Sequence, residues 1–194
     1  MKNISLARKL ALGLGALVLV VAIGSPAGAL DAYQDRSGFF SGVGLGGGGA
    51  FQGGDPGGAL LLDFQLGGGA SKNLTLDLDL DLCFQLMDKH RNFLITPGPE
   101  INYFFGETGI FIRGGIGMAL VFTWFDDPKE DIPAGGKEPE NNDFNIGFDA
   151  SIGVGWEFFA NSNLAVGLAV EADYVVLKGD DIIGVGFSIG LKYY

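Results

Sequence analysis

The chain has 194 residues, enough for one domain and a targeting segment. Its net charge of −11 argues against nucleic-acid binding, because phosphate recognition needs a basic surface, and its single cysteine excludes an internal disulfide framework. Beyond the N-terminal segment, the apolar residues alternate with polar ones and form no run long enough for a transmembrane helix.

Residues 1–29 have the pattern of a cleaved secretory signal peptide. Positive residues precede the apolar run 10–23, and Ala27-Gly28-Ala29 supplies the small residues of a cleavage site. The alternative is an uncleaved membrane anchor, but Pro26 and the two residues before it end the apolar run early. We therefore expect a mature domain over residues 30–194.

Alternating apolar and polar residues then predict eight β-strands, because successive side chains of a strand point to opposite faces. In chain order the predicted strands cover residues 38–50, 59–67, 74–87, 93–105, 110–125, 144–159, 164–177 and 182–194. The third shows the pattern most clearly: its even positions from Leu74 to Leu86 are all apolar, whereas its odd positions include Asp77, Asp79 and Asp81. This strand is longer than the about 9–11 residues that a tilted strand needs to cross a bilayer.

Two features of the connections shape the expected fold. Short turns are predicted at residues 68–73, 106–109 and 160–163 on one end, and loops at 47–58, 88–92, 126–143 and 178–181 on the other. In the fourth strand, Pro97 and Pro99 remove ladder donors, so we expect a distortion or bulge there. Because hydrocarbon tolerates no open strand edge, we predict an all-β fold, an eight-stranded antiparallel up-and-down transmembrane β-barrel.

The signal peptide, the alternating strands, the short turns and the C-terminal residues Gly190-Leu191-Lys192-Tyr193-Tyr194 together resemble the small eight-stranded outer-membrane β-barrels of Gram-negative bacteria, the OmpA/OmpX-like barrels. The resemblance covers the whole mature chain. It implies a porin-like, monomeric barrel of the cell outer membrane, in contact with outer-membrane lipid and lipopolysaccharide and inserted by the barrel-assembly machinery. These families usually end on an aromatic residue that faces lipid, whereas Tyr194 is one residue out of phase with Leu191 and Tyr193.

A soluble, lipocalin-like barrel also alternates, but it places its apolar face inward. Three features favour an outward apolar face. The polar face is rich in glycine, which suits a narrow lumen; aromatic residues gather near both ends of the apolar face, like the girdles at two membrane interfaces; and the signal peptide provides the export route.

The polar face defines a candidate lumen network. Its inward acids are Asp63, Asp77, Asp79, Asp81, Glu100, Asp149, Glu157, Glu171 and Asp173, and its inward bases are Arg113 and Lys192. We expect Asp63 to pair opposite Asp77 and Asp149 opposite Asp173. We also expect Arg113 to hold a charge-assisted network with Glu100 and Glu157 near the turn end. Because the acids outnumber their partners, we expect repulsion among them.

No metal, cofactor or catalytic residue is predicted. Asp77-x-Asp79-x-Asp81 resembles the start of a calcium loop, but Leu82 and Asp88 stand where an EF-hand needs Gly and Glu. The spacing Gly44-x-Gly46-x-x-Gly49 matches a dinucleotide fingerprint only by letters, because no helix follows.

His90 and Cys83 are the two remaining side chains with catalytic potential. Lipid hydrolases and acyltransferases on this fold rely on a histidine near a serine and an acid, but His90 lies among charged residues without a neighbouring serine. We therefore predict a solvated loop residue. Cys83 is predicted to be a small lumen side chain, because no basic neighbour would activate its thiol.

The sequence thus predicts an integral outer-membrane barrel with a structural or surface-interaction role and no catalysis. One alternative is a narrow cation-preferring outer-membrane pore, and another is an outer-membrane lipid-modifying enzyme. The acidic segment 126–143 is expected to be a solvated loop; alternatively, it bridges through divalent cations to lipopolysaccharide or binds something outside the cell.

Overall fold

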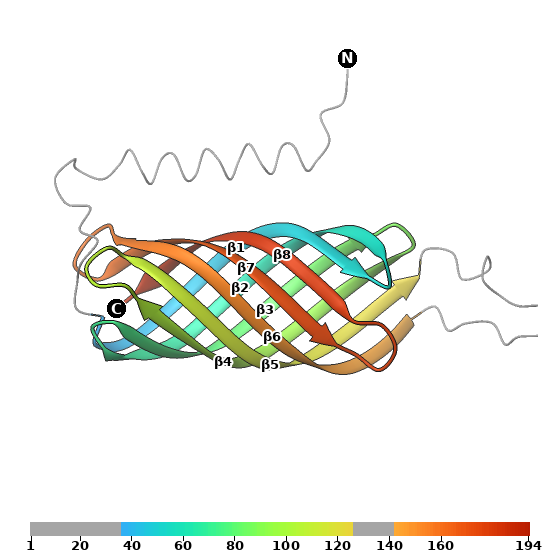
Figure 1. Cartoon of the computed structure of the whole chain (residues 1–194), viewed down its shortest axis with the longest axis horizontal. Helices are drawn as coiled ribbons and strands as arrows, with labels where there is room; N and C mark the ends of the chain where they lie inside the picture. Colours follow the sequence, from blue (N-terminus) through green and yellow to red (C-terminus); the bar gives the residue numbers. More distant parts are fainter. Residues whose placement is uncertain (1–35, 126–141) are drawn as a thin grey trace, which may run out of the picture.

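The computed structural model describes residues 36–125 and 142–194, so the predicted signal peptide and most of the acidic segment 126–143 lie outside the described residues. The strands are β1 (Gly38–Gln52), β2 (Asp55–Ser71), β3 (Leu74–Met87), β4 (His90–Phe104), β5 (Ile110–Phe125), β6 (Asn142–Phe159), β7 (Leu164–Val176) and β8 (Ile182–Tyr193). Each pairs antiparallel with the next, and β8 returns to β1, which closes the barrel (Figure 1). The predicted fold class is confirmed. No helix among the described residues is long and apolar enough to cross a membrane.

The two ends of the barrel differ in what they hold. The C-terminus lies at the same end as the β2–β3, β4–β5 and β6–β7 connections, which we call the turn end (Figure 1). The opposite end, the loop end, carries the β1–β2, β3–β4 and β7–β8 connections. The chain also enters β1 at the turn end, so both ends of the described barrel meet there.

The predicted glycine-rich loop 47–58 is wrong. β1 and β2 pair as far as Gln52 opposite Asp55, which leaves only Gly53 and Gly54 in the turn. Both have positive φ angles, 57° and 92°, as a tight hairpin of type I′ requires. The loop predicted at residues 88–92 is also shorter than expected, because β3 ends at Met87 and β4 begins at His90. In the glycine-rich segment 47–58, the strand pattern was hidden because glycines have no side chains that alternate between the two faces.

The apolar face points outward along the whole barrel. Leu76 and Leu78 of β3 are 51% and 65% exposed, whereas Asp77 between them is 6% exposed. The exposed large side chains on the other strands are likewise almost all apolar or aromatic. Such a continuous apolar surface is far larger than a water-soluble monomer presents, and it suits hydrocarbon. The alternative with an inward apolar face is therefore contradicted.

The two prolines of β4 interrupt one ladder only. Pairing with β3 continues through Pro97 and Pro99, but pairing with β5 stops after Ile95 and resumes at Glu100 in the same register. Residues two apart in a strand direct their backbone groups to the same neighbour, so both missing donors face β5. The predicted distortion is confirmed, as a gap in the ladder without the register shift of a bulge.

Candidate functional site

The lumen is filled by side chains that lie in layers from the turn end to the loop end. An eight-stranded barrel has an interior just wide enough for its own side chains, so their chemistry decides whether anything passes or binds. All eleven residues of the predicted lumen network lie on strands of the closed sheet. Of these, Asp63, Asp77, Glu100, Arg113, Asp149, Glu157 and Glu171 are buried.

At the turn end, a cluster that we call the turn-end plug fills the mouth of the barrel. It consists of Arg36, Phe40, Phe104, Glu157, Phe159 and Tyr194. The Arg36 guanidinium is fully buried, lies 3.8 Å from the centre of the Phe104 ring and donates from Nε to Glu157 Oε1 at 2.7 Å. The Tyr194 hydroxyl donates to the same carboxylate at 3.0 Å. Tyr194 is out of phase with the lipid-facing residues because its ring packs in the plug, against Phe40 and Phe159.

On the lumen side of the plug, Arg113 lies between acids of two strands, β4 and β7. Its Nε is 3.7 Å from Glu100 Oε2, as predicted, and its Nη2 donates to Glu171 Oε2. Asn102 bridges Glu100 and Asp77 with hydrogen bonds of 3.0 Å to each. The predicted contact of Arg113 with Glu157 is wrong. Glu157 lies closer to the turn end, where Arg36 and Tyr194 bind it and Lys192 Nζ lies 4.0 Å away.

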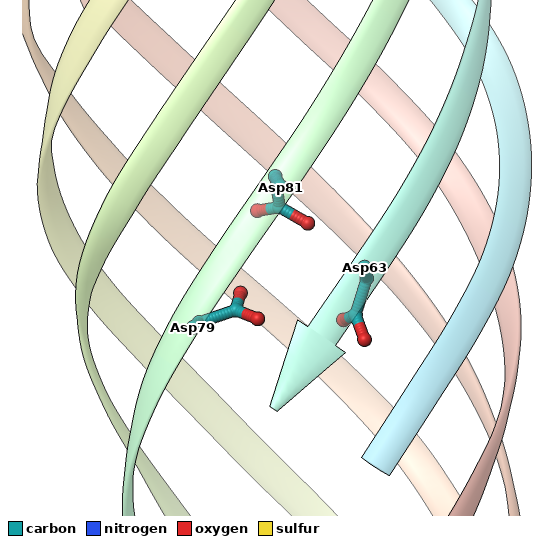
Figure 2. Close-up of side chains that lie close together, drawn as sticks. All are labelled: Asp63, Asp79 and Asp81. Carbon is teal, nitrogen blue, oxygen red and sulfur yellow. The ribbon is translucent and has the colours of Figure 1, made fainter. Parts of the chain in front are cut away.

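Further along, Asp63, Asp79 and Asp81 bring three carboxylates together, with one oxygen of each within 4.8 Å of the others (Figure 2). The predicted pairing of Asp63 with Asp77 is wrong, because β2 extends to Ser71 and places Asp63 opposite Asp81. Carboxylate oxygens of this kind suit hard cations, although three are fewer than the 6–8 oxygens that calcium takes. Gln65 donates to Asp63 Oδ2 at 3.1 Å, whereas Asp79 Oδ1 is buried with no hydrogen-bond partner.

Asp149 and Asp173 belong to the opposite wall of the lumen. The predicted pairing between them is wrong: Asp149 lies opposite Val175, and Asp173 lies opposite Ser151. The β6–β7 register is shifted by two residues from the predicted one, so both aspartates still point inward. Together with Asp81 they line a cavity of about 60 Å³.

Two layers close the loop end. Leu94, Ala119, Val121, Val175 and Ile182 form an apolar layer across the lumen, with Cys83 packed against it. The polar layer outside it joins four strands: Thr123 donates to Asn92, Asn92 donates to Gln85 and Gln52, and Gln52 also bonds His90 Nε2 at 3.0 Å. The prediction that His90 is a solvated loop residue is therefore wrong, since it begins β4 and is 9% exposed.

Sequence reasoning missed the turn-end plug. Phe40, Phe104, Phe111 and Phe159 all carry the parity of the lumen face, and all lie near the turn end. The plug could therefore have been predicted from these aromatic residues, because they are out of phase with the lipid-facing set and lie near the strand termini at one end of the barrel. Arg36 has the same parity as Phe40, so the polar lead-in before β1 carried that signal too.

The comparisons with known proteins concern the fold. No protein-family model and no curated protein sequence matches the chain. The barrel is similar to the crystal structure of Neisserial surface protein A (NspA), with 14% sequence identity, a TM-score of 0.56, and coverage of 82% of this chain and 98% of that chain. It is also similar to Ail, the attachment invasion locus protein of Yersinia pestis, with 10% identity, a TM-score of 0.52, and coverage of 79% and 98%. The chain therefore has the fold of the small eight-stranded outer-membrane β-barrels. Its apolar outer surface agrees with the predicted location in the outer membrane.

Proposed function

We propose that this outer-membrane barrel is a closed, non-conducting protein with a structural or surface-interaction role and no catalysis. Its lipid-facing surface would hold it in the outer membrane, in contact with lipid and lipopolysaccharide, as a monomer inserted by the barrel-assembly machinery. The loop end would then present its connections to the outside of the cell.

The filling of the lumen carries this proposal. The turn-end plug occupies one mouth, and the apolar and polar layers occupy the other. Cavities between them have volumes of about 60, 30 and 10 Å³, which is room for a few water molecules. A packed interior of this kind supports a scaffold better than a channel.

Planar bilayer recordings test the proposal directly. The purified barrel, shown to be folded by its different gel mobility before and after boiling, should give no steady conductance. A steady current that scales with the amount of inserted protein would contradict a closed lumen.

The second candidate, a narrow cation-preferring pore, is favoured by one observation. The acids of the lumen outnumber the bases that face them, and Asp63, Asp79 and Asp81 form a negative group on one wall of the lumen. Rings of carboxylates select cations in channels. If a current appears, its reversal potential in a salt gradient should show cation preference, and this candidate then replaces the first.

The third candidate, a lipid-modifying enzyme, requires a nucleophile and a base at the lipid surface. His90 instead faces the lumen and bonds Gln52, next to Phe125. We expect lipid A from cells that express the chain to have an unchanged mass spectrum. A mass change that disappears in His90→Ala would establish catalysis and overturn the proposal.

A further inference from the structure

We propose that Arg36, just before β1, and Tyr194, just after β8, form a latch on Glu157. This latch shuts the turn-end mouth and controls the access of water and small cations to the acidic lumen. The inference rests on the proposed closed lumen, but it concerns one mouth only. It assigns that closure to two residues outside the barrel strands.

Arg36 closes the mouth from the N-terminal side. It precedes β1, yet its side chain is fully buried, with the guanidinium stacked 3.8 Å from the Phe104 ring centre and 5.4 Å from that of Phe159. Its Nε binds Glu157 on β6, more than a hundred residues away in sequence. An arginine in a connecting segment without a structural role would keep its charge in water. The burial of Arg36 therefore indicates a specific binding site for its guanidinium.

Tyr194 closes the same mouth from the C-terminal side. Its hydroxyl donates to both oxygens of Glu157, at 3.0 and 3.2 Å, and its ring lies 5.3 Å from each of the Phe40 and Phe159 rings. Its backbone is tied to Asn163 in the β6–β7 turn by bonds of 2.8 and 3.2 Å. Glu157 therefore binds, with one carboxylate, the residue that precedes β1 by two positions and the residue that follows β8.

The latch is built so that it can open. Neither Arg36 nor Tyr194 lies in a strand, so the closed sheet does not depend on them. The Nη1 and Nη2 atoms of Arg36 are buried without a hydrogen-bond partner. Unpaired buried donors lose their hydration without compensation, which destabilises the closed state relative to an open state in which water reaches them.

The space behind the latch identifies what it would admit. A cavity of about 30 Å³ lies directly inside it, lined by Glu157, Lys192, Ser188 and Arg113 among others. Asp63 also lines this cavity, and it belongs to the three-carboxylate group beyond (Figure 2). An opening of the latch would thus join outside water to a strongly negative interior, which attracts small cations.

Thiol accessibility tests the latch on the whole barrel in lipid vesicles. Cys83→Ser removes the native thiol, and Ser188→Cys introduces a reporter that faces the cavity behind the latch. The reporter should react slowly with methanethiosulfonate reagents when the latch is intact. Arg36→Ala and removal of Tyr194 should each accelerate the reaction at least tenfold, with both a cationic and a neutral reagent. Tyr194→Phe keeps the ring contacts and should accelerate it less.

The controls separate an open mouth from other causes. Glu107→Ala removes a charge from an exposed turn at the same end and should leave the rate unchanged. Gel mobility before and after boiling confirms that each variant is folded. If Arg36→Ala does not fold, Arg36→Lys replaces it and should accelerate the thiol reaction in the same way, because a lysine cannot stack as a planar guanidinium. Unchanged rates in the folded latch variants, or acceleration by the cationic reagent alone, would overturn the latch. Conductance of the unaltered barrel would instead overturn the proposed function, so the two failures are distinguishable.

Discussion

Arg113 of β5 reaches across the whole width of β6 to donate a hydrogen bond to Glu171 of β7. The residue between them is Gly153, which pairs with Arg113 on one side and with Glu171 on the other. A Cβ atom at Gly153 would lie 3.0 Å from Arg113 Nε and equally close to the Val170 carbonyl oxygen. The ion pair therefore exists because a glycine leaves room for the guanidinium to pass.

This relationship predicts that Gly153→Ala weakens the barrel although it adds only a methyl group. The Val170 carbonyl is backbone and cannot move away easily, so the guanidinium must shift from Glu171. We expect a loss of about 1–3 kcal/mol in the free energy of unfolding, measured by urea titration in lipid vesicles. Gly167→Ala is the matched control, because a Cβ there meets no atom within 4 Å. Equal effects at the two positions would contradict the role given to Gly153.

The pair itself can be tested by removing its partners singly and together. Arg113→Met leaves Glu100 and Glu171 buried without their cation and should destabilise the barrel by about 3–5 kcal/mol. Arg113→Met combined with Glu171→Met should recover part of this loss, because Glu171, the acid that accepts the hydrogen bond of Arg113, is then no longer buried without its cation. Additive losses in the double variant would mean that the two side chains do not interact energetically.

Sequence patterns predicted the sheet well and the lumen incompletely. The bounds of β3 and β5 agree with the predicted strands, because large side chains alternate there with polar or small ones over many residues. Register was less predictable, since it depends on where each turn falls: four extra residues at the turn end of β2 are enough to move Asp63 from Asp77 to Asp81. Parity marked the aromatic residues of the plug, but the contacts among its residues could not be predicted, because Arg36 and Tyr194 lie outside the strands and meet only when the barrel closes.

The three-carboxylate group predicts a stabilising substitution. One carboxylate oxygen of Asp79 lies within 4.8 Å of one oxygen each of Asp63 and Asp81. The Oδ1 atom of Asp79 is buried and accepts no hydrogen bond. Two unit charges about 4 Å apart repel by up to about 4 kcal/mol at an effective dielectric constant of about 20. Asp79→Asn removes one charge and adds a donor that can reach the neighbouring carboxylates, so the free energy of unfolding should rise by about 1–3 kcal/mol.

The measurement for Asp79→Asn is a urea titration in vesicles, run with EDTA and again with calcium. Asp88→Asn, at an exposed position of the loop end, should have no effect in either condition. If calcium stabilises the unaltered barrel and Asp79→Asn abolishes that gain, the group holds a cation. A destabilised Asp79→Asn variant in EDTA would show instead that the repulsion is already compensated.

The outward leucine face leads to the last prediction. Leu80 lies in the middle of β3 between Phe64 and Pro97 and is 37% exposed, so its side chain should meet the centre of the bilayer. A charge at that depth loses its hydration, and Leu80→Arg should cost about 2–4 kcal/mol in the free energy of unfolding. Leu74→Arg, at the turn end of the same strand, places the same charge near the interface, where the cost falls to about 0–1 kcal/mol. Both variants are compared by urea titration in vesicles. Equal costs at Leu74 and Leu80 would mean that this face of β3 does not cross hydrocarbon, because only a membrane makes the penalty depend on depth.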